Sequence, residues 1–134
     1  MPSIFTKIVR GEIPSYKVAE DDRFLAFLDV FPLREGHTLV IPKKEVDYLY
    51  DLDEATYNDL MAFSRKIALA IKEAVPCKRI SMQVIGLEVP HAHVHLIPIN
   101  NMHDCDFSRE KAKFTKEQFE KTARAIASKM KVSG

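Results

Sequence analysis

Three histidines at alternate positions stand inside an apolar run, and this spacing constrains the fold more than any other feature of the chain. The stretch Val89 to Asn100 has the sequence VPHAHVHLIPIN and holds three of the five histidines. Alternate side chains of a β-strand point to the same face, so His91, His93 and His95 would lie on one face, roughly 6.5–7 Å apart. A helix would instead rotate them by about 200° at each step. The pattern therefore predicts a strand whose other, apolar face belongs to a core.

Four further strands and three helices are predicted from the apolar patterns and turn residues. The strands cover residues 15–21, 23–30, 36–42 and 78–86. A short helix from Ser3 to Gly11, a long one from Asp53 to Val75 and a C-terminal one complete the prediction. The fold class is therefore α+β, with a five-stranded antiparallel sheet packed with a long central helix, a short N-terminal helix and a C-terminal helix.

Two helix signals are specific. Thr115 and Gln118 have the spacing of a capping box, and Phe114 and Phe119 have the spacing of a hydrophobic staple. The long helix is predicted to bury a stripe of five residues, namely Leu60, Ser64, Ile67, Ile71 and Ala74.

Length and composition exclude several classes of protein. A chain of 134 residues, with 46% hydrophobic and 29% charged residues, fits one globular domain. The net charge of +1 gives no general field for nucleic acid, and no apolar run is long enough to span a membrane. Cys77 and Cys105 fit no metal or redox spacing, and the N-terminus lacks the apolar region of a secretory signal. These features favour a cytoplasmic protein.

Three interpretations of the clustered histidines are open. They could decorate a solvated strand face, or two of them could chelate zinc, although no acidic residue follows His95 until Asp104. They could also carry out phosphoryl or nucleotidyl transfer, because a neutral imidazole attacks phosphorus and a second imidazole can stabilise charge or protonate the leaving group. A third imidazole can hold the others in the right tautomer.

The histidine stretch resembles the signature of the histidine triad (HIT) superfamily. The motif HAHVHLI has three alternating histidines followed by two apolar residues. Three earlier blocks, SIFTKIVRGEIPS, EDDRFLAFLDVFP and GHTLVIPKK, are similar to the N-terminal half of Hint-type members in order and spacing. The resemblance covers roughly residues 3 to 99. It implies a HIT-like fold in a single domain, 1–134, with a core at about 3–99 and a C-terminal helical extension at about 107–131.

The resemblance also implies a mechanism. Members of the family are homodimers that bind a purine nucleoside monophosphate moiety, AMP or GMP. By position His93 would attack the α-phosphorus, and water would then hydrolyse the nucleotidyl-histidine. His95 would bind the phosphate and assist the leaving group, His91 would support the site by hydrogen bonding, and His37 would complete the imidazole network.

Further residues match nucleotide-binding positions of the family. Asp29 matches the acidic residue that binds the ribose hydroxyls, and a carboxylate can accept both hydrogen bonds. Gln83 stands where many relatives have an asparagine near the phosphate, and Glu88 stands where they have a serine that contacts the leaving group. The apolar positions around the base correspond to Phe5, Ile8, Leu28, Val30 and Leu39, each of which could equally be a core residue.

The sequence departs from a metal-binding variant of the family. Some bacterial relatives bind structural zinc, and three of the four ligand positions correspond here to Ser3, Thr6 and Glu45. No structural zinc and no cofactor are therefore predicted. His103 is expected at the surface, and the charged run from Arg109 to Lys113 is expected to be mostly solvated.

The predicted function is a phosphoramidase that hydrolyses the P–N bond of purine nucleoside monophosphate derivatives. The alternatives are a dinucleoside polyphosphate hydrolase of the same superfamily, a non-catalytic nucleotide-binding module and a zinc hydrolase. A homodimer is also expected, because an open sheet leaves its edges unpaired. Met61, Phe63 and Leu69 add apolar surface to the long helix outside its main stripe.

Overall fold

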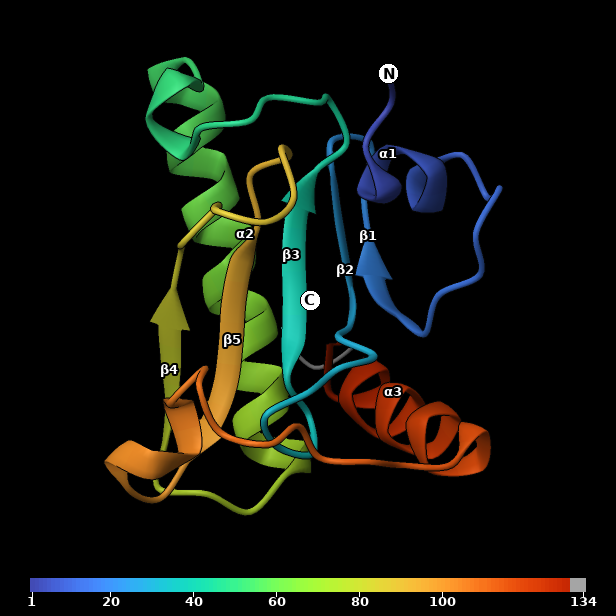
Figure 1. Ribbon diagram of the computed structural model, residues 1–134, viewed down its shortest axis with the longest axis vertical. Coiled ribbons are helices and arrows are strands. Elements are labelled where there is room, and N and C mark those ends of the chain that lie inside the picture. Colours follow the sequence, from blue (N-terminus) through green and yellow to red (C-terminus); the bar gives the residue numbers. More distant parts are fainter. Residues whose placement is uncertain (131–134) are drawn as a thin grey trace.

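The computed structural model describes residues 1–130 and is built on one antiparallel sheet with the strand order β1-β2-β3-β5-β4 (Figure 1). The strands are β1 (Lys17–Glu20), β2 (Phe24–Leu28), β3 (Thr38–Pro42), β4 (Arg79–Gln83) and β5 (Val94–Ile99). The α+β prediction is confirmed, and β3 lies at the centre of the sheet between β2 and β5.

The strand that carries the histidines is shorter than predicted. It begins at Val94, so His91 and His93 precede it. The His91 N–H donates to the carbonyl of Val89, and the Ala92 N–H donates to the carbonyl of Val46 outside the sheet. These bonds take the backbone out of the ladder, because each N–H can be used for only one strong pairing.

Three helices and two short 3₁₀ segments complete the fold. They are α1 (Ile4–Val9), η1 (Leu49–Asp51), α2 (Glu54–Ala74), η2 (Met102–Cys105) and α3 (Lys116–Met130). Ser3 caps α1 and Asp53 caps α2, each accepting a hydrogen bond from the backbone N–H three residues later. The helix α2 runs along one face of the sheet (Figure 1) and buries four of the five predicted residues. The fifth, Ala74, is only half-buried, and Ala70 is buried instead.

The C-terminal extension is helical only in its second part. The helix α3 begins at Lys116, directly after the predicted capping box at Thr115, and residues 107–115 before it are not helical. The Gln118 N–H donates to Thr115 Oγ1 over 3.1 Å, and the Thr115 N–H donates to Gln118 Oε1 over 2.8 Å. The staple also forms, with the rings of Phe114 and Phe119 5.6 Å apart. Residue 131 lies outside the described part of the chain.

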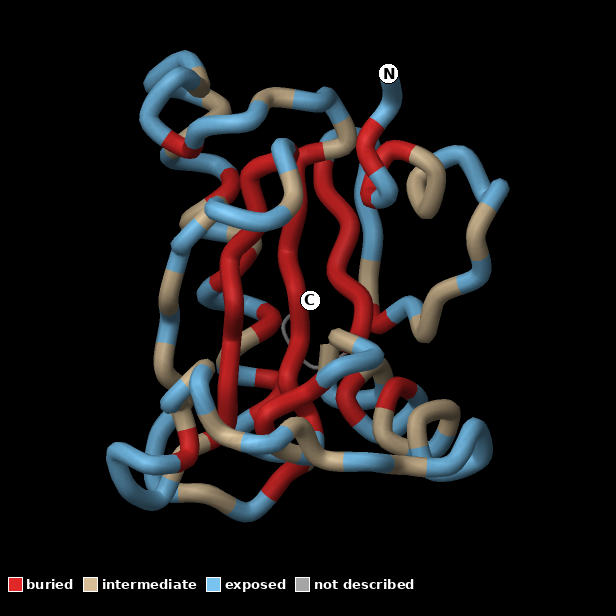
Figure 2. Tube along the Cα trace, viewed as in Figure 1, coloured by how far each residue is buried: buried red, intermediate tan, exposed pale blue. Residues whose placement is uncertain are grey.

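Two apolar clusters occupy opposite faces of the sheet. The helix-covered face packs against α2 and α3 and includes Ala26, Leu28, Val94 and Leu96. The opposite face, here called the histidine face, contains the cluster Phe5, Leu25, Phe27, Leu39 and Ile41 under α1. β2 and β3 are buried along their whole length and β5 as far as Pro98, whereas β4 at the edge is largely not buried (Figure 2).

Apolar residues at the surface gather near the β4 edge. Met61 and Phe63 pack against the core, contrary to the prediction for these two residues, whereas Leu69 is 52% exposed. The exposed residues in β4 and the loop after it are Met82, Val84, Ile85 and Leu87. No helix within residues 1–130 is both long enough and apolar enough to cross a membrane.

Candidate active site

Four of the five histidines form one continuous buried row. His37, His91, His93 and His95 each have 7% of their surface exposed or less. The ring centroids of His93 and His95 lie 4.9 Å apart, and those of His37 and His95 lie 5.3 Å apart. The predicted shared face of the three alternating histidines is therefore present. His103 is exposed and lies outside the row, as predicted.

The tautomer of His93 follows from one contact. Its Nδ1 atom lies 2.8 Å from the carbonyl oxygen of His91. A carbonyl oxygen can only accept, so Nδ1 carries the proton and the lone pair of the neutral ring is on Nε2. The ring of Phe5 packs edge-on against His93 with a centroid distance of 5.0 Å, which restricts its rotation. The neutral ring of His93 therefore has its lone pair on Nε2, the form that a nucleophile or a general base needs.

The tautomer of His95 is the opposite of that of His93. It is set by His37, whose own tautomer is fixed by a backbone N–H. The Leu33 N–H donates to His37 Nδ1 over 3.0 Å, so the proton of neutral His37 is on Nε2. That Nε2 lies 3.0 Å from His95 Nδ1, which must therefore accept. The proton of neutral His95 is then on Nε2. Two neighbouring imidazoles thus differ in function, one with a free lone pair and one with a hydrogen-bond donor.

Burial keeps the rings of His37 and His95 neutral. Burial lowers the pKa of His37 to about 3, with the nearby charge of Lys111 as the second cause. Burial also lowers the pKa of His95 to about 3, followed by the effects of His37 and His93. Desolvation disfavours the charged form of an imidazole, so both rings are neutral at physiological pH. The tautomers derived for neutral rings therefore apply.

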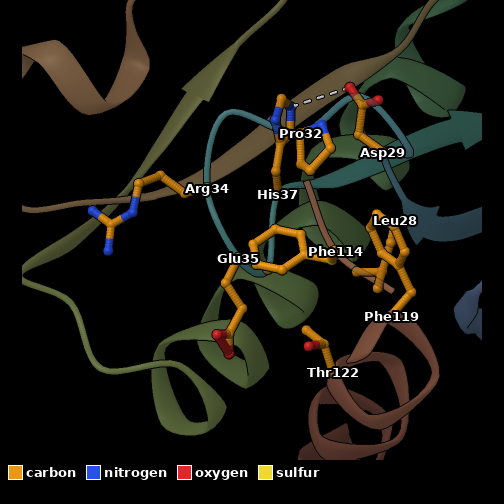
Figure 3. Close-up of a pocket in the computed structure, with 10 residues that line it drawn as sticks. Leu28, Asp29, Pro32, Arg34, Glu35, His37, Phe114, Phe119 and Thr122 are labelled. Carbon is orange, nitrogen blue, oxygen red and sulfur yellow. Dashed lines mark ion pairs between the residues drawn. The ribbon is translucent and has the colours of Figure 1, made fainter. Parts of the chain in front are cut away.

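Asp29 reaches the same network from the end of β2. Its Oδ2 atom lies 3.6 Å from His37 Nε2, and its Oδ1 atom accepts a hydrogen bond from the Phe31 N–H over 2.9 Å. Figure 3 shows Asp29 facing His37 at a small pocket that Phe114 and Phe119 also line. The carboxylate is only 18% exposed, so a polar ligand at this site would contact a partly desolvated acceptor.

Asp29, His37 and His95 are also close enough to be considered as metal ligands. One ligand atom from each lies within 4.8 Å of the others. A metal on Nε2 of His37 would move the ring proton to Nδ1. That N–H would then face the Leu33 N–H, and the hydrogen bond that Nδ1 accepts from Leu33 would be lost. The hydrogen-bond pattern therefore favours a proton relay over a metal centre at these three residues.

The sequence reasoning missed two residues beside the row. The ring of Phe107 packs edge-on against His95 at 4.9 Å and against His37 at 6.1 Å. Lys111 donates to the carbonyl of Phe107 over 2.7 Å, and its charge acts on both histidines. Half-buried Lys111 lies in the run that was predicted to be mostly solvated. No periodic pattern marks this segment, because it is not helical.

Ion pairs hold this segment in place. Asp104, which is 7% exposed, accepts from Arg34 over 2.6 Å and lies 3.5 Å from Arg109. The Ala112 N–H donates to the carbonyl of Pro32 over 2.8 Å. The segment from residue 105 to residue 115 is therefore attached to the β2–β3 loop that also carries His37.

The predicted base contacts divide between three environments. Phe5, Ile8 and Leu39 belong to the histidine face. Leu28 does not: it is 2% exposed and packs on the helix-covered face, because it alternates with Phe27 along β2. Val30 is 50% exposed and lines a groove of about 590 Å³ between residues 14–17 and α3. The structure therefore places Leu28 in the core on the helix-covered side, where it also lines the small pocket that Asp29 and His37 share.

Gln83 and Glu88 differ in their distance from the row. Gln83 pairs with His95 across β4 and β5, so the two side chains share a face. Its amide lies 3.5 Å from the carbonyl of Cys105. Glu88 is exposed in the loop before His91.

The three positions associated with zinc in some relatives also come together here. Ser3, Thr6 and Glu45 form a hydrogen-bonded cluster against His91, with Ser3 Oγ 2.8 Å from His91 Nδ1. The other ring nitrogen, Nε2, lies 2.7 Å from the carbonyl oxygen of Pro42.

The sequence is similar to proteins of one family. The model of the HIT domain family matches residues 10–102. The adenosine 5′-monophosphoramidase of Saccharomyces cerevisiae is 38% identical over 96 residues, which cover 71% of this chain and 61% of the yeast protein. The corresponding enzyme of Schizosaccharomyces pombe is 37% identical over 102 residues, covering 75% and 77% of the two chains.

The fold agrees as well. A crystal structure of a HIT-like protein involved in cell-cycle regulation from Bartonella henselae matches with a TM-score of 0.82 and 36% identity. The match covers 95% of each chain.

Proposed function

The chain belongs to the HIT domain family, and from this premise we propose that it hydrolyses the P–N bond of purine nucleoside phosphoramidates. One observation carries the proposal. The neighbouring rings of His93 and His95 have opposite tautomers, because His93 Nδ1 donates to a carbonyl and His95 Nδ1 accepts from His37. Phosphoryl transfer uses this combination of a nucleophile and an adjacent hydrogen-bond donor that stabilises the developing negative charge.

In the first step His93 Nε2 attacks the α-phosphorus, and a P–N bond to the ring forms. The bond from phosphorus to the leaving amine breaks once the amine nitrogen has taken a proton from solvent, while the neutral ring of His95 keeps its Nε2 proton and donates a hydrogen bond to that nitrogen. The same N–H first stabilises the negative phosphate oxygens, because a buried donor is worth more there than in water. His37 Nε2 donates to His95 Nδ1 throughout and keeps that ring in the required tautomer.

In the second step water attacks phosphorus and breaks the bond to His93. One water proton goes to solvent, which balances the proton taken by the amine in the first step, and the nucleoside monophosphate leaves. His93 Nε2 regains its lone pair, while the bond from Nδ1 to the His91 carbonyl holds the ring in place during both steps.

The nucleoside half of the substrate is proposed to contact Asp29 and the apolar residues of the histidine face. The Oδ2 atom of Asp29 lies 3.6 Å from His37 Nε2, too far for a strong hydrogen bond, so it can still accept hydrogen bonds from ribose hydroxyls. Phe5, Ile8 and Leu39 offer an apolar surface for the base. The names of the two yeast relatives support adenosine 5′-monophosphate as the nucleotide moiety.

A homodimer is part of the proposal. β4 is an edge strand, and exposed Met82, Ile85 and Leu87 lie in it or just after it. A second copy related by a two-fold axis could pair the open edge and cover these side chains at once.

A cytoplasmic location is also proposed. It is supported by the free thiols of Cys77 and Cys105, because a reducing compartment keeps thiols in this state.

A comparison of substrates tests the function. Adenosine 5′-phosphoramidate and a diadenosine polyphosphate are offered separately to the wild-type protein, to His93→Ala and to the control His103→Ala. We expect faster turnover of the phosphoramidate by the wild type and by His103→Ala, and AMP binding without turnover by His93→Ala. Preference for the polyphosphate would favour the other hydrolase of the superfamily. AMP binding without turnover by the wild type would identify a non-catalytic module.

A further inference from the structure

A four-residue cluster lies at the end of the histidine row that is farthest from His37. Glu45, in the loop after β3, accepts two hydrogen bonds on Oε1. One comes from the Ser3 N–H over 2.7 Å and the other from Thr6 Oγ1 over 2.6 Å. Ser3 Oγ accepts from the Thr6 N–H over 3.0 Å and lies 2.8 Å from His91 Nδ1. The cluster joins residues up to 88 positions apart in the sequence.

The directions of the short hydrogen bonds in this cluster, those of 3.0 Å or less, can be assigned. His91 Nε2 must donate to the carbonyl of Pro42, since that oxygen only accepts. His91 Nδ1 of the neutral ring must then accept, so the Ser3 hydroxyl donates to it. The Thr6 hydroxyl donates to Glu45, because a carboxylate only accepts. The Pro42 carbonyl thus sets the direction of the bond between Ser3 and His91, and the Glu45 carboxylate sets the direction of the bond from Thr6.

Glu45 is held in its ionised form. The hydrogen bond from the Ser3 backbone, followed by the one from the Thr6 side chain, lowers the pKa of Glu45 to about 2. Burial lowers the pKa of His91, which keeps its ring neutral and its Nδ1 free to accept.

The cluster ends on the group that orients His93. The backbone carbonyl of His91 is the oxygen that accepts from His93 Nδ1. The ring of His91 is fixed from two sides, by Ser3 and by Pro42, and its surface is 0% exposed. A shift of this residue would therefore move the carbonyl and release the Nδ1 proton of His93.

We propose that Glu45 and Ser3 are positioning residues, which hold His91 so that its carbonyl keeps His93 in the Nδ1–H tautomer with Nε2 free. This inference rests on the proposed function in one respect only, namely that a free Nε2 on His93 is needed for turnover. The hydrogen bonds of this cluster thus connect the start of α1 to the proposed nucleophile, His93.

Three variants separate positioning from general support. Glu45→Ala removes the acceptor, Glu45→Gln keeps an acceptor oxygen of nearly the same shape, and Asp47→Ala removes another exposed acid of the same loop as a control. We measure kcat and KM with adenosine 5′-phosphoramidate. In parallel, ¹⁵N chemical shifts of the imidazoles report the His93 tautomer in the free protein.

We expect Glu45→Ala to lower kcat about ten- to hundredfold, with a smaller change in KM, since slight misplacement of a reacting group costs this much. Its His93 signals should show a mixture of tautomers. Glu45→Gln should recover most of kcat and the single Nδ1–H tautomer, and Asp47→Ala should match the wild type. If Glu45→Ala does not fold, Ser3→Ala decides the matter by the same two readouts, because it removes the hydroxyl that contacts His91.

A Glu45→Ala protein that retains both the Nδ1–H tautomer and the wild-type kcat would overturn the inference. Loss of kcat with an unchanged tautomer would also overturn it, because the residue would then act in some other way. The tautomer needs no substrate, so a wild-type protein without turnover would refute the proposed function and leave the positioning result to stand or fall by itself.

Discussion

The Nδ1 atom of His93 lies 2.8 Å from the carbonyl oxygen of His91, two residues earlier in the chain. This contact assigns the ring proton to Nδ1 and leaves Nε2 free. A histidine that met a donor at this position would have the opposite tautomer and could not attack phosphorus through Nε2. The nucleophile of the proposed reaction is thus prepared by its own backbone.

Asp29 should distinguish ribose from deoxyribose. Replacement by alanine removes the carboxylate that is placed to accept from the ribose hydroxyls, so binding of AMP should weaken by about 1–3 kcal/mol. Binding of 2′-deoxy-AMP should weaken less. Titration calorimetry with both ligands on wild type and Asp29→Ala measures the difference. Equal affinity of the wild type for AMP and its 2′-deoxy form would contradict this role.

Stability should fall in mild acid because of His37 and His95. Their pKa values are about 3 in the folded protein, and an unfolded histidine titrates near pH 6.5. Above about pH 6.5 both states are neutral, and these two groups add no pH dependence. Below it the unfolded chain binds protons that the folded protein excludes, so the free energy of unfolding decreases by up to about 1.4 kcal/mol per pH unit for each group.

Chemical denaturation between about pH 7 and about pH 5.5 measures this slope, in a range where ordinary carboxylates remain charged. The variant His37→Asn keeps an acceptor for the Leu33 N–H but does not titrate, so its slope should be shallower. Identical slopes for the two proteins would show that His37 does not exclude protons on folding.

The shared face of the histidines and the start of α3 could both be predicted from local sequence patterns. Alternation placed His91, His93 and His95 on one face, and the spacing of Thr115 and Gln118 predicted the start of α3. The same alternation, applied to β2, would have placed Leu28 on the opposite face from Phe27.

The contacts that set the tautomers have no local pattern. The donor to His37 is the backbone N–H of Leu33, and every residue other than proline has such a group. Phe107 and Lys111 reach the row through a non-helical segment, which Asp104 ties to Arg34, 70 positions earlier. Such contacts depend on the folded path of the chain.

Phe107 should matter to His95 more than its partial burial suggests. Phe107→Ala removes the ring that packs against His95 and His37, so we expect a loss of about 1–3 kcal/mol in stability, below the range for a fully buried ring. Loss of this support should also lower kcat by about tenfold. The control is Phe31→Ala, since Phe31 is 70% exposed. If both variants behave alike, the packing on His95 has no functional role.

The β4 edge should be the dimer interface. Light scattering should give about twice the chain mass of 15.3 kDa for the wild type. Met82→Asp should lower the mass toward that of one chain, because a charge would have to be buried between two copies. Met102→Asp, at a residue that is 82% exposed outside this patch, should leave the dimer intact. A wild-type mass near 15.3 kDa would refute the proposed assembly.

The most direct test of the account is to trap the covalent intermediate on His93. The protein is mixed with adenosine 5′-phosphoramidate in the presence of EDTA, quenched in base, and digested for mass spectrometry. We expect an adenylyl group on His93 that is labile in acid, as a phosphoramidate is. The adduct should be absent from His93→Ala and should form equally well with the chelator present. Turnover without any adduct on His93, or turnover that EDTA abolishes and zinc restores, would contradict it.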